Sequence, residues 1–176
     1  MPANPGNHPI DAEQSGDSHQ YLTFNLSNET FALGILAIKE IIEYSEPTAV
    51  PMMPDYLRGV INLRGRVVPV IDLARRLGKS PAVVGKRTCI VIVEIEFESE
   101  RHDVGVVVDC VNAVLEIPSE DIEPPPSFGM RIRSEFIAGM GKISGKFVMV
   151  IATHQLLASS EMEALTGGAA EHSEVA

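Results

Sequence analysis

The sequence has no apolar run approaching the roughly 18 residues that a membrane-spanning helix requires. Its first residues, MPANPGNH, contain neither the basic segment nor the apolar segment of an export signal. We therefore expect no insertion into a membrane and predict that the protein is cytoplasmic.

Cysteine is scarce as well. The two cysteines, Cys89 and Cys110, have a spacing that fits no metal-binding motif. A reducing compartment would keep both side chains as thiols even if the fold brought them together. We interpret both as small, buried apolar residues.

Catalytic motifs are missing too. The sequence contains no HExxH, GxSxG or CxxC, and none of its five histidines lies in a motif. The segment GMGKISGKF resembles a phosphate-binding loop, but Gly141 and Gly145 are one residue too close for GxxxxGK, and Phe147 replaces the required Ser or Thr. We therefore predict a protein that is not an enzyme and that holds no metal and no cofactor.

Basic residues are too few for a nucleic-acid-binding protein, because the net charge is −10. Residues 1–20 carry three acids and residues 159–176 carry four, without Lys or Arg in either segment, which leaves 17 acids against 14 bases in between. Such a near-balanced body suits protein partners. We expect residues 1–19 to form a disordered acidic tail, and residues 159–176 to form a short helix followed by a flexible acidic tail.

What the sequence does contain is an internal repeat. Residues 56–77 align without a gap onto residues 136–157, and six of the 22 positions are identical. Residues 33–42 also match residues 106–115, and Leu22, Phe24 and Leu26 match Val91, Val93 and Ile95. The matches follow the same order in both halves, which indicates a duplicated unit.

Each copy has the pattern of a small β-structure. YLTFNL and CIVIVEIEF alternate with the period of a half-buried strand, and each precedes a polar turn and a second apolar strand. A proline-rich connector, another strand, a Gly-centred turn, a very apolar strand and a brief helix complete the copy. Four or five short strands per copy imply a small barrel, because closure removes exposed sheet edges.

Polar residues that only one copy has are better functional candidates than residues that both share. Arg64 corresponds to Ser144, and Asp72 corresponds to Ala152. Arginine is a frequent anchor at protein interfaces, so Arg64 favours a binding role. Asp72 is interpreted first as the cap of the short helix LARRL. Ile41 is expected in the core, whereas the sequence alone does not decide whether Ile38 is core or a surface contact beside Glu40.

The segment GVINLRGRVVPVIDL at residues 59–73 resembles the CheW family, the coupling proteins of bacterial chemotaxis. The likeness extends through FALGILAIKEIIEY, VGVVVDCVNAVLEIP and EFIAGMGKISGKFVMVI, and covers roughly residues 20–166. It implies an all-β fold with two pseudo-symmetric five-stranded β-barrels, a shared hydrophobic core and a few short helices. The CheW-like domain would span residues 20–158, with barrel-like halves at about 20–80 and 86–158 between which strands can be exchanged.

The resemblance also implies a function. It predicts an adaptor that couples the cytoplasmic tips of methyl-accepting chemotaxis receptors to the regulatory domain of the histidine kinase CheA, within membrane-anchored receptor arrays. The alternatives are a coupling protein of a twitching or other non-flagellar chemosensory system, and a small-molecule-binding β-barrel. Carried over residue by residue, the protein-binding positions are Ile38, Glu40, Gly59, Asn62, Arg64, Gly65 and Asp72.

Overall fold

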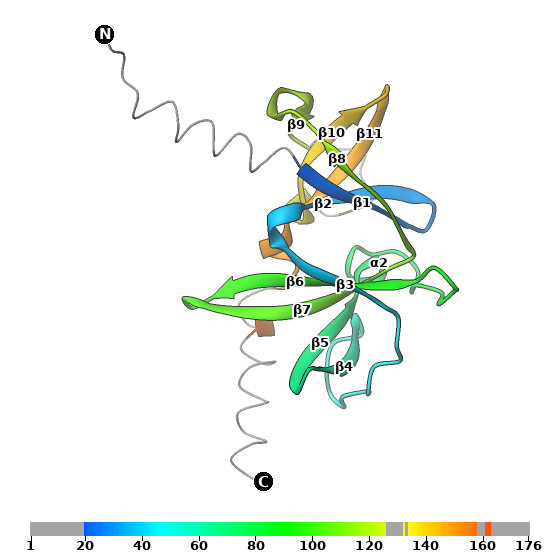
Figure 1. The fold of residues 1–176 in the computed structure, drawn as a ribbon, viewed down its shortest axis with the longest axis vertical. Coiled ribbons are helices and arrows are strands. Elements are labelled where there is room, and N and C mark those ends of the chain that lie inside the picture. Colours follow the sequence, from blue (N-terminus) through cyan, green and yellow to red (C-terminus); the bar gives the residue numbers. More distant parts are fainter. Residues whose placement is uncertain (1–19, 126–131, 133, 158–160, 163–176) are drawn as a thin grey trace.

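A computed structural model describes residues 20–125, 132, 134–157 and 161–162 of the chain. The expected N-terminal tail, residues 1–19, lies outside the described residues. Of residues 159–176 only Glu161 and Met162 are described, and both are helical. The described chain is mostly strand, arranged in two sheets (Figure 1), so the predicted all-β fold is confirmed.

Sheet A has six strands, in the spatial order β8 (Cys110–Glu116), β1 (Gln20–Leu26), β2 (Glu29–Gly34), β11 (Lys146–Ile151), β10 (Ile137–Ile143) and β9 (Ile122–Glu123). Sheet B has five strands, in the order β3 (Ile38–Glu43), β6 (Cys89–Phe97), β7 (Glu100–Val108), β5 (Arg66–Asp72) and β4 (Leu57–Leu63). Besides Glu161 and Met162, the described residues form one turn of α-helix and four 3-10 turns: α2 (Leu73–Arg76), η1 (Ile35–Ala37), η2 (Ser119–Asp121), η3 (Ser134–Phe136) and η4 (Thr153–Gln155).

The two copies of the repeat exchange their first hairpins. The β1–β2 hairpin of the first copy joins β8, β10 and β11 of the second, whereas the β6–β7 hairpin of the second copy joins β3, β4 and β5 of the first. The exchange uses equivalent parallel contacts, because Val70 pairs with Gly105 in sheet B and Val150 pairs with Ala32 in sheet A. Neither copy therefore forms a sheet by itself.

Equivalent irregularities support the pseudo-symmetry of the two sheets. The register shifts at Arg58 in β4 and at Ala138 in β10, and again at Lys39 in β3 and Asn112 in β8. In each pair the two residues occupy the same position of the repeat. Bulges of this kind increase the local twist, so both sheets curl in the same way.

The curled sheets do not close into barrels, which corrects the prediction of closed five-stranded barrels. Among the described residues, the backbone contact between the chain after β3 and strand β4 is the bridge of Thr48 with Val60, with N···O distances of 2.8 and 2.9 Å. Prolines explain the short contact: Pro47, Pro51 and Pro54 have no N–H group with which to extend a ladder after β3. In sheet A the corresponding contact is the two-residue strand β9 against β10.

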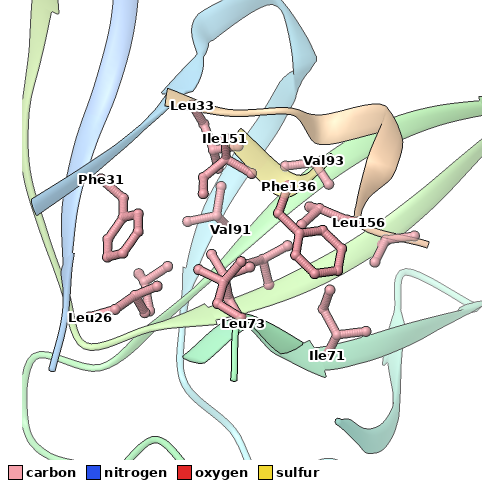
Figure 2. Close-up of a cluster of buried hydrophobic side chains, with 14 of the residues drawn as sticks. Leu26, Phe31, Leu33, Ile71, Leu73, Val91, Val93, Phe136, Ile151 and Leu156 are labelled. Atoms are coloured by element: carbon pink, nitrogen blue, oxygen red, sulfur yellow. The ribbon is translucent and has the colours of Figure 1, made fainter. Parts of the chain in front are cut away.

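The largest core cluster lies between the two sheets. Figure 2 shows side chains of sheet A, including Leu26, Phe31 and Leu33, facing Val91 and Val93 of sheet B. All five are almost completely buried. Burial on this scale removes enough apolar surface from water to hold the sheets together.

The two cysteines differ in their surroundings. Cys110 is buried as predicted, whereas Cys89, the first residue of β6, is only half-buried. Both are free thiols. Partial burial raises the pKa of the Cys89 thiol, and the charges of Cys110 and Glu43 raise it further.

Arg76 joins the two copies of the repeat. Its guanidinium carbon lies 4.4 Å from the ring centre of Tyr56 and 4.8 Å from that of Phe136, which are equivalent residues of the two copies. Its Nε donates to the carbonyl of Leu156 at 2.7 Å, and its Nη2 donates to Glu161 at 2.9 Å. Cation–π contacts and charge-assisted hydrogen bonds thus meet at one largely buried side chain.

We expect Arg76→Leu to lower the free energy of unfolding by about 2 kcal/mol, because two ring contacts and two hydrogen bonds are lost at once. Leucine is the residue that stands at the equivalent position, Leu156. Urea denaturation of the purified protein measures the effect, with Arg76→Lys as the variant that keeps the charge but not the planar group. A stability equal to that of the wild type would show that the contacts of Arg76 contribute nothing net.

Candidate protein-binding site

An exposed ion pair connects the two edges of sheet B. Arg64 lies in the β4–β5 turn, and its Nη1 and Nη2 donate to the two carboxylate oxygens of Glu40 at 2.6 and 2.7 Å. Glu40 is on β3, so the pair spans the gap between β3 and β4 that the backbone ladder leaves open. The hydrogen bonds from Arg64 lower the pKa of the Glu40 carboxyl, and those to Glu40 raise the pKa of Arg64.

The turn that carries Arg64 is tight. Arg64 and Gly65 have φ angles of 53° and 84°, and the side chain of Asn62 accepts a hydrogen bond from the Gly65 N–H at 2.8 Å. Two consecutive positive φ angles are those of the hairpin turn that matches the twist of antiparallel strands. Asn62 and Gly65 therefore shape the turn and present Arg64.

Gly59 lies where the chain after β3 crosses β4. Its φ is 142°, and a Cβ atom built on it would be 2.1 Å from the carbonyl oxygen of Thr48. That oxygen accepts the hydrogen bond from Val60 in the bridge. Glycine is required here because the two backbones approach too closely for a side chain.

Asp72 is buried, and its carboxylate points into the protein. It accepts hydrogen bonds from the backbone N–H of Arg75 at 3.2 Å and of Ala82 at 3.0 Å, and it lies 3.2 Å from the Nη2 of Arg58. The first of these bonds caps helix α2, as predicted. The carboxylate of Asp72 is therefore turned away from the surface.

Arg58 was not among the residues that we selected from the sequence. It donates to the hydroxyl of Tyr44 at 3.0 Å and to the carbonyl of Ala82 at 2.6 Å, in addition to its contact with Asp72. The repeat contained the signal, because Ala138 stands at the position of Arg58 and Ala152 stands at the position of Asp72. The second copy thus lacks both members of the Arg58–Asp72 ion pair.

The structure decides the place of Ile38, which the sequence left open, and shows that Ile41 is not placed as expected. Ile38 is half-buried and packs against the main core, whereas Ile41, which we expected in the core, is exposed. The reason is topological: β3 is an edge strand of sheet B, so its side chains are covered on one flank only. Hydrophobic pattern alone does not distinguish an edge strand from a central one.

Exposed apolar side chains lie close in sequence to Arg64 and Glu40. Leu36 precedes β3, Ile41 follows Glu40 directly, and Val67 lies in β5, three residues after Arg64. The positions equivalent to Ile41 and Val67 are Val114 and Phe147 of sheet A, and they are exposed as well. Each sheet therefore exposes apolar side chains at the same two positions.

The structure brings four of the seven selected residues together. Glu40, Asn62, Arg64 and Gly65 form one cluster, which we call the arginine cluster, while Gly59 lies farther along β4 and Asp72 is buried. An exposed arginine beside apolar side chains is typical of a protein interface. In the part of the chain that the structure describes, no three His, Cys, Asp or Glu side chains could hold a metal ion, and no helix is long and apolar enough to cross a membrane.

Most of the chain is similar in sequence to known proteins. Residues 20–161 match the family model described as the CheW-like domain. The chain is 31% identical to the chemotaxis protein CheW of Klebsiella aerogenes, with 87% of this chain and 90% of the relative covered. It is 34% identical to the probable chemotaxis protein CheW of Rhizobium etli, with 82% and 91% covered. It is also 30% identical to protein FrzA of Myxococcus xanthus, with 76% and 81% covered.

The fold agrees with that likeness. The crystal structure of the scaffolding protein TtCheW from Thermoanaerobacter tengcongensis superposes with a TM-score of 0.73, at 33% identity, covering 82% of this chain and 90% of that one. The CheW family is a family of scaffolding proteins without catalytic activity. Because the family model matches residues 20–161 and the relatives match most of the chain, the chain belongs to the CheW family and is a coupling adaptor of chemotaxis signalling.

Proposed function

We propose that this protein has no catalytic activity and links methyl-accepting chemotaxis receptors to a CheA-type histidine kinase in the cytoplasm. The observation that carries the proposal is the arginine cluster, where the exposed Arg64 is held by Glu40 on a sheet that also exposes the apolar side chains of Ile41 and Val67. A guanidinium held in one orientation loses less conformational freedom on binding than a mobile one. Such a cluster is suited to a protein partner.

An adaptor needs surfaces that differ from each other. The equivalent positions of Glu40 and Arg64 in sheet A are Ala113 and Ser144, so the two sheets have the same backbone but different chemistry at their ends. Two such ends allow head-to-tail contacts with two different partners, and contacts of this type can close into rings. The receptor is proposed to contribute a helical hairpin, packed along apolar surface of the adaptor.

The seven selected residues divide into two groups under this proposal. Ile38, Glu40 and Arg64 are proposed to lie at the interface with a partner. Gly59, Asn62, Gly65 and Asp72 are proposed to act by holding strand β4, its turn and helix α2 in the binding geometry. Substitutions in the second group are therefore expected to affect folding and binding together.

We expect Arg64→Glu to weaken the assembly of adaptor, kinase and receptor by tenfold or more, since an interface arginine is replaced by the opposite charge (about 1.4 kcal/mol per factor of ten). The thermal stability should change little, because both side chains of the pair are at the surface. Co-sedimentation of the adaptor with the regulatory domain of the kinase and the cytoplasmic fragment of a receptor measures the assembly.

The matched control is Ser144→Glu, which introduces the same side chain at the equivalent turn of sheet A. It tests whether any new carboxylate in a hairpin turn disturbs assembly. The exchange variant Glu40→Arg/Arg64→Glu adds a second test, because it restores the pair with its polarity reversed. If the exchange restores assembly, Arg64 acts by closing sheet B; if assembly stays weak, Arg64 contacts a partner. Wild-type assembly of Arg64→Glu would contradict both roles.

A second candidate is the same coupling role in a chemosensory system that is not flagellar. The likeness to FrzA of Myxococcus xanthus, a relative that is not named CheW, supports it. The genes next to this one decide between the two candidates, because a neighbouring kinase and receptor identify the system. A small-molecule-binding barrel has less support, since the interior of both sheets is filled by apolar side chains.

A further inference from the structure

We propose that the end of sheet B near the arginine cluster binds carboxylate groups on the surface of a protein partner, and that Arg66 is a contact residue there. The proposal rests on the adaptor function above and adds the chemistry of the partner's surface. It concerns residues outside the seven that the sequence selected.

A network of charged side chains extends from the arginine cluster across sheet B. Lys39 Nζ lies 3.2 Å from the Asp103 carboxylate and 3.9 Å from that of Glu94. Arg66 Nη1 lies 3.4 Å from the same carboxylate of Asp103, and Arg101 Nη1 lies 3.8 Å from Glu94. The network therefore connects β3, β5, β6 and β7, and it adjoins the arginine cluster at Glu40, the residue after Lys39.

The network closes the end of an apolar core. Along their strands, Arg66 is two residues from the buried Val68, and Glu94 is two residues from the buried Ile92. Residues two apart on a strand share a face, so the charged side chains continue the face whose other members fill the interior of sheet B. Because Arg66 and Arg101 are exposed, this end of the sheet is accessible to a partner.

The cations form the outer layer of the network. The side chains of Arg64, Arg66 and Arg101 are 62–75% exposed, whereas those of their partners Glu40, Asp103 and Glu94 are 7–30% exposed. Asp103, the deepest of the carboxylates, lies between two cations, Lys39 and Arg66. One negative charge shared by two positive ones leaves a positive charge at the surface, at the β4–β5 hairpin.

Arg66 is better placed than Arg101 to bind a partner's carboxylate. Arg101 lies opposite Glu96 in the β6–β7 register, so a second, exposed carboxylate stands beside it in addition to Glu94. Arg66 has the carboxylate of Asp103, which it shares with Lys39. The positive charge left at the surface is therefore that of Arg66, since Arg64, two residues away, is paired with Glu40.

Sheet A has the same arrangement with fewer charges. Arg66 corresponds to another cation, Lys146, but three other members of the network are replaced by neutral residues: Lys39 by Asn112, Glu94 by Asn25 and Asp103 by Thr30. The amide of Asn112 donates to the side-chain oxygen of Asn25 at 2.9 Å, and the hydroxyl of Thr30 donates to it at 3.3 Å. Since neutral side chains satisfy the same backbone, the fold does not require the charges of sheet B.

A charged network at the end of sheet B and a largely neutral one at the end of sheet A suit two different partners. An apolar surface that docked on sheet B would strip water from the charged side chains without replacing their interactions, which is costly. A partner carrying carboxylates would instead be attracted by Arg64 and Arg66. Nucleic acid is a poor alternative, because the net charge of the chain is −10 and carboxylates alternate with the cations.

The test compares Arg66→Gln with Lys146→Gln, its exposed equivalent in sheet A. Dissociation constants are measured for the kinase regulatory domain and for the receptor cytoplasmic fragment, each at about 50 mM and about 500 mM NaCl, where screening differs strongly. We expect Arg66→Gln to lower the affinity for one of the two partners by about three- to tenfold at low salt and by less than twofold at high salt. Lys146→Gln should leave the affinity for the same partner unchanged, and Arg66→Lys should retain most of that affinity.

Three results would overturn the inference, and the first two would leave the adaptor function intact. The first is wild-type affinity of Arg66→Gln for both partners at low salt. The second is a loss of affinity that is just as large at high salt, which would assign Arg66 a packing role. Tighter binding of double-stranded DNA than of either protein would also overturn it. If the wild-type chain binds neither protein, the proposed function fails and the inference fails with it.

Discussion

Gly59→Ala is expected to lower the free energy of unfolding by about 3 to 5 kcal/mol. The new methyl group would lie 2.1 Å from the carbonyl oxygen of Thr48 and 2.6 Å from its carbonyl carbon, both of which are backbone atoms. Relief requires that the chain after β3 move away, which breaks the bridge between Thr48 and Val60. The φ of 142° adds strain for any residue with a side chain.

Chemical denaturation of Gly59→Ala measures the loss, and Gly145→Asn is the matched control. Gly145 also has a positive φ, of 81°, but no atom lies within 4 Å of a Cβ built there, and asparagine tolerates this conformation. The control should lose less than about 1 kcal/mol. Equal stability of Gly59→Ala and the wild type would show that β4 and the chain after β3 do not approach this closely. If the prediction holds, binding defects at position 59 are defects of the fold.

Asp72→Ala is expected to lower the free energy of unfolding by about 3 to 5 kcal/mol, because a buried ion pair loses one member and Arg58 keeps an uncompensated charge. The same substitution removes the cap of α2 and the acceptor for the Ala82 N–H. Asp72→Asn keeps the shape and one acceptor oxygen, so it should be less damaging. Thermal and urea denaturation rank the stabilities of the wild type, Asp72→Asn and Asp72→Ala.

The repeat supplies a stringent check on that prediction. Sheet A has Ala138 and Ala152 where sheet B has Arg58 and Asp72, so the same backbone exists without the pair. The double variant Arg58→Ala/Asp72→Ala should therefore be more stable than the sum of the single effects implies, with a coupling energy of about 1 to 3 kcal/mol. Additive losses would mean that the two side chains stabilise the fold independently.

Much of the architecture was predictable because it depends on local pattern. Alternating apolar residues indicate strands, and the matched segments 56–77 and 136–157 indicate a duplication. The equivalent turns at Arg64–Gly65 and Ser144–Gly145 adopt the same conformation in both copies, as expected from the repeat. Membership of an adaptor family also followed from ordered segments of sequence.

The pairing of strands was not predictable in the same way. Each β-hairpin could pack on its own copy or on the other one with the same local residues, and only the connections in three dimensions select the exchange. Ile41 and Cys89 were interpreted as core residues and are not fully buried, because position in the sheet decides coverage more than hydrophobicity does.

By itself, the sequence determined that this protein is all-β, built from two related units, and suited to binding other proteins. These properties follow from periodicity, repetition and composition, which are encoded residue by residue. Only the tertiary structure decided that Arg64 meets Glu40, that Asp72 is turned inward onto Arg58, and that Lys39 and Arg66 share Asp103. Those contacts join residues 14 to 64 positions apart, so they exist only once the sheets curl and bring distant strands together.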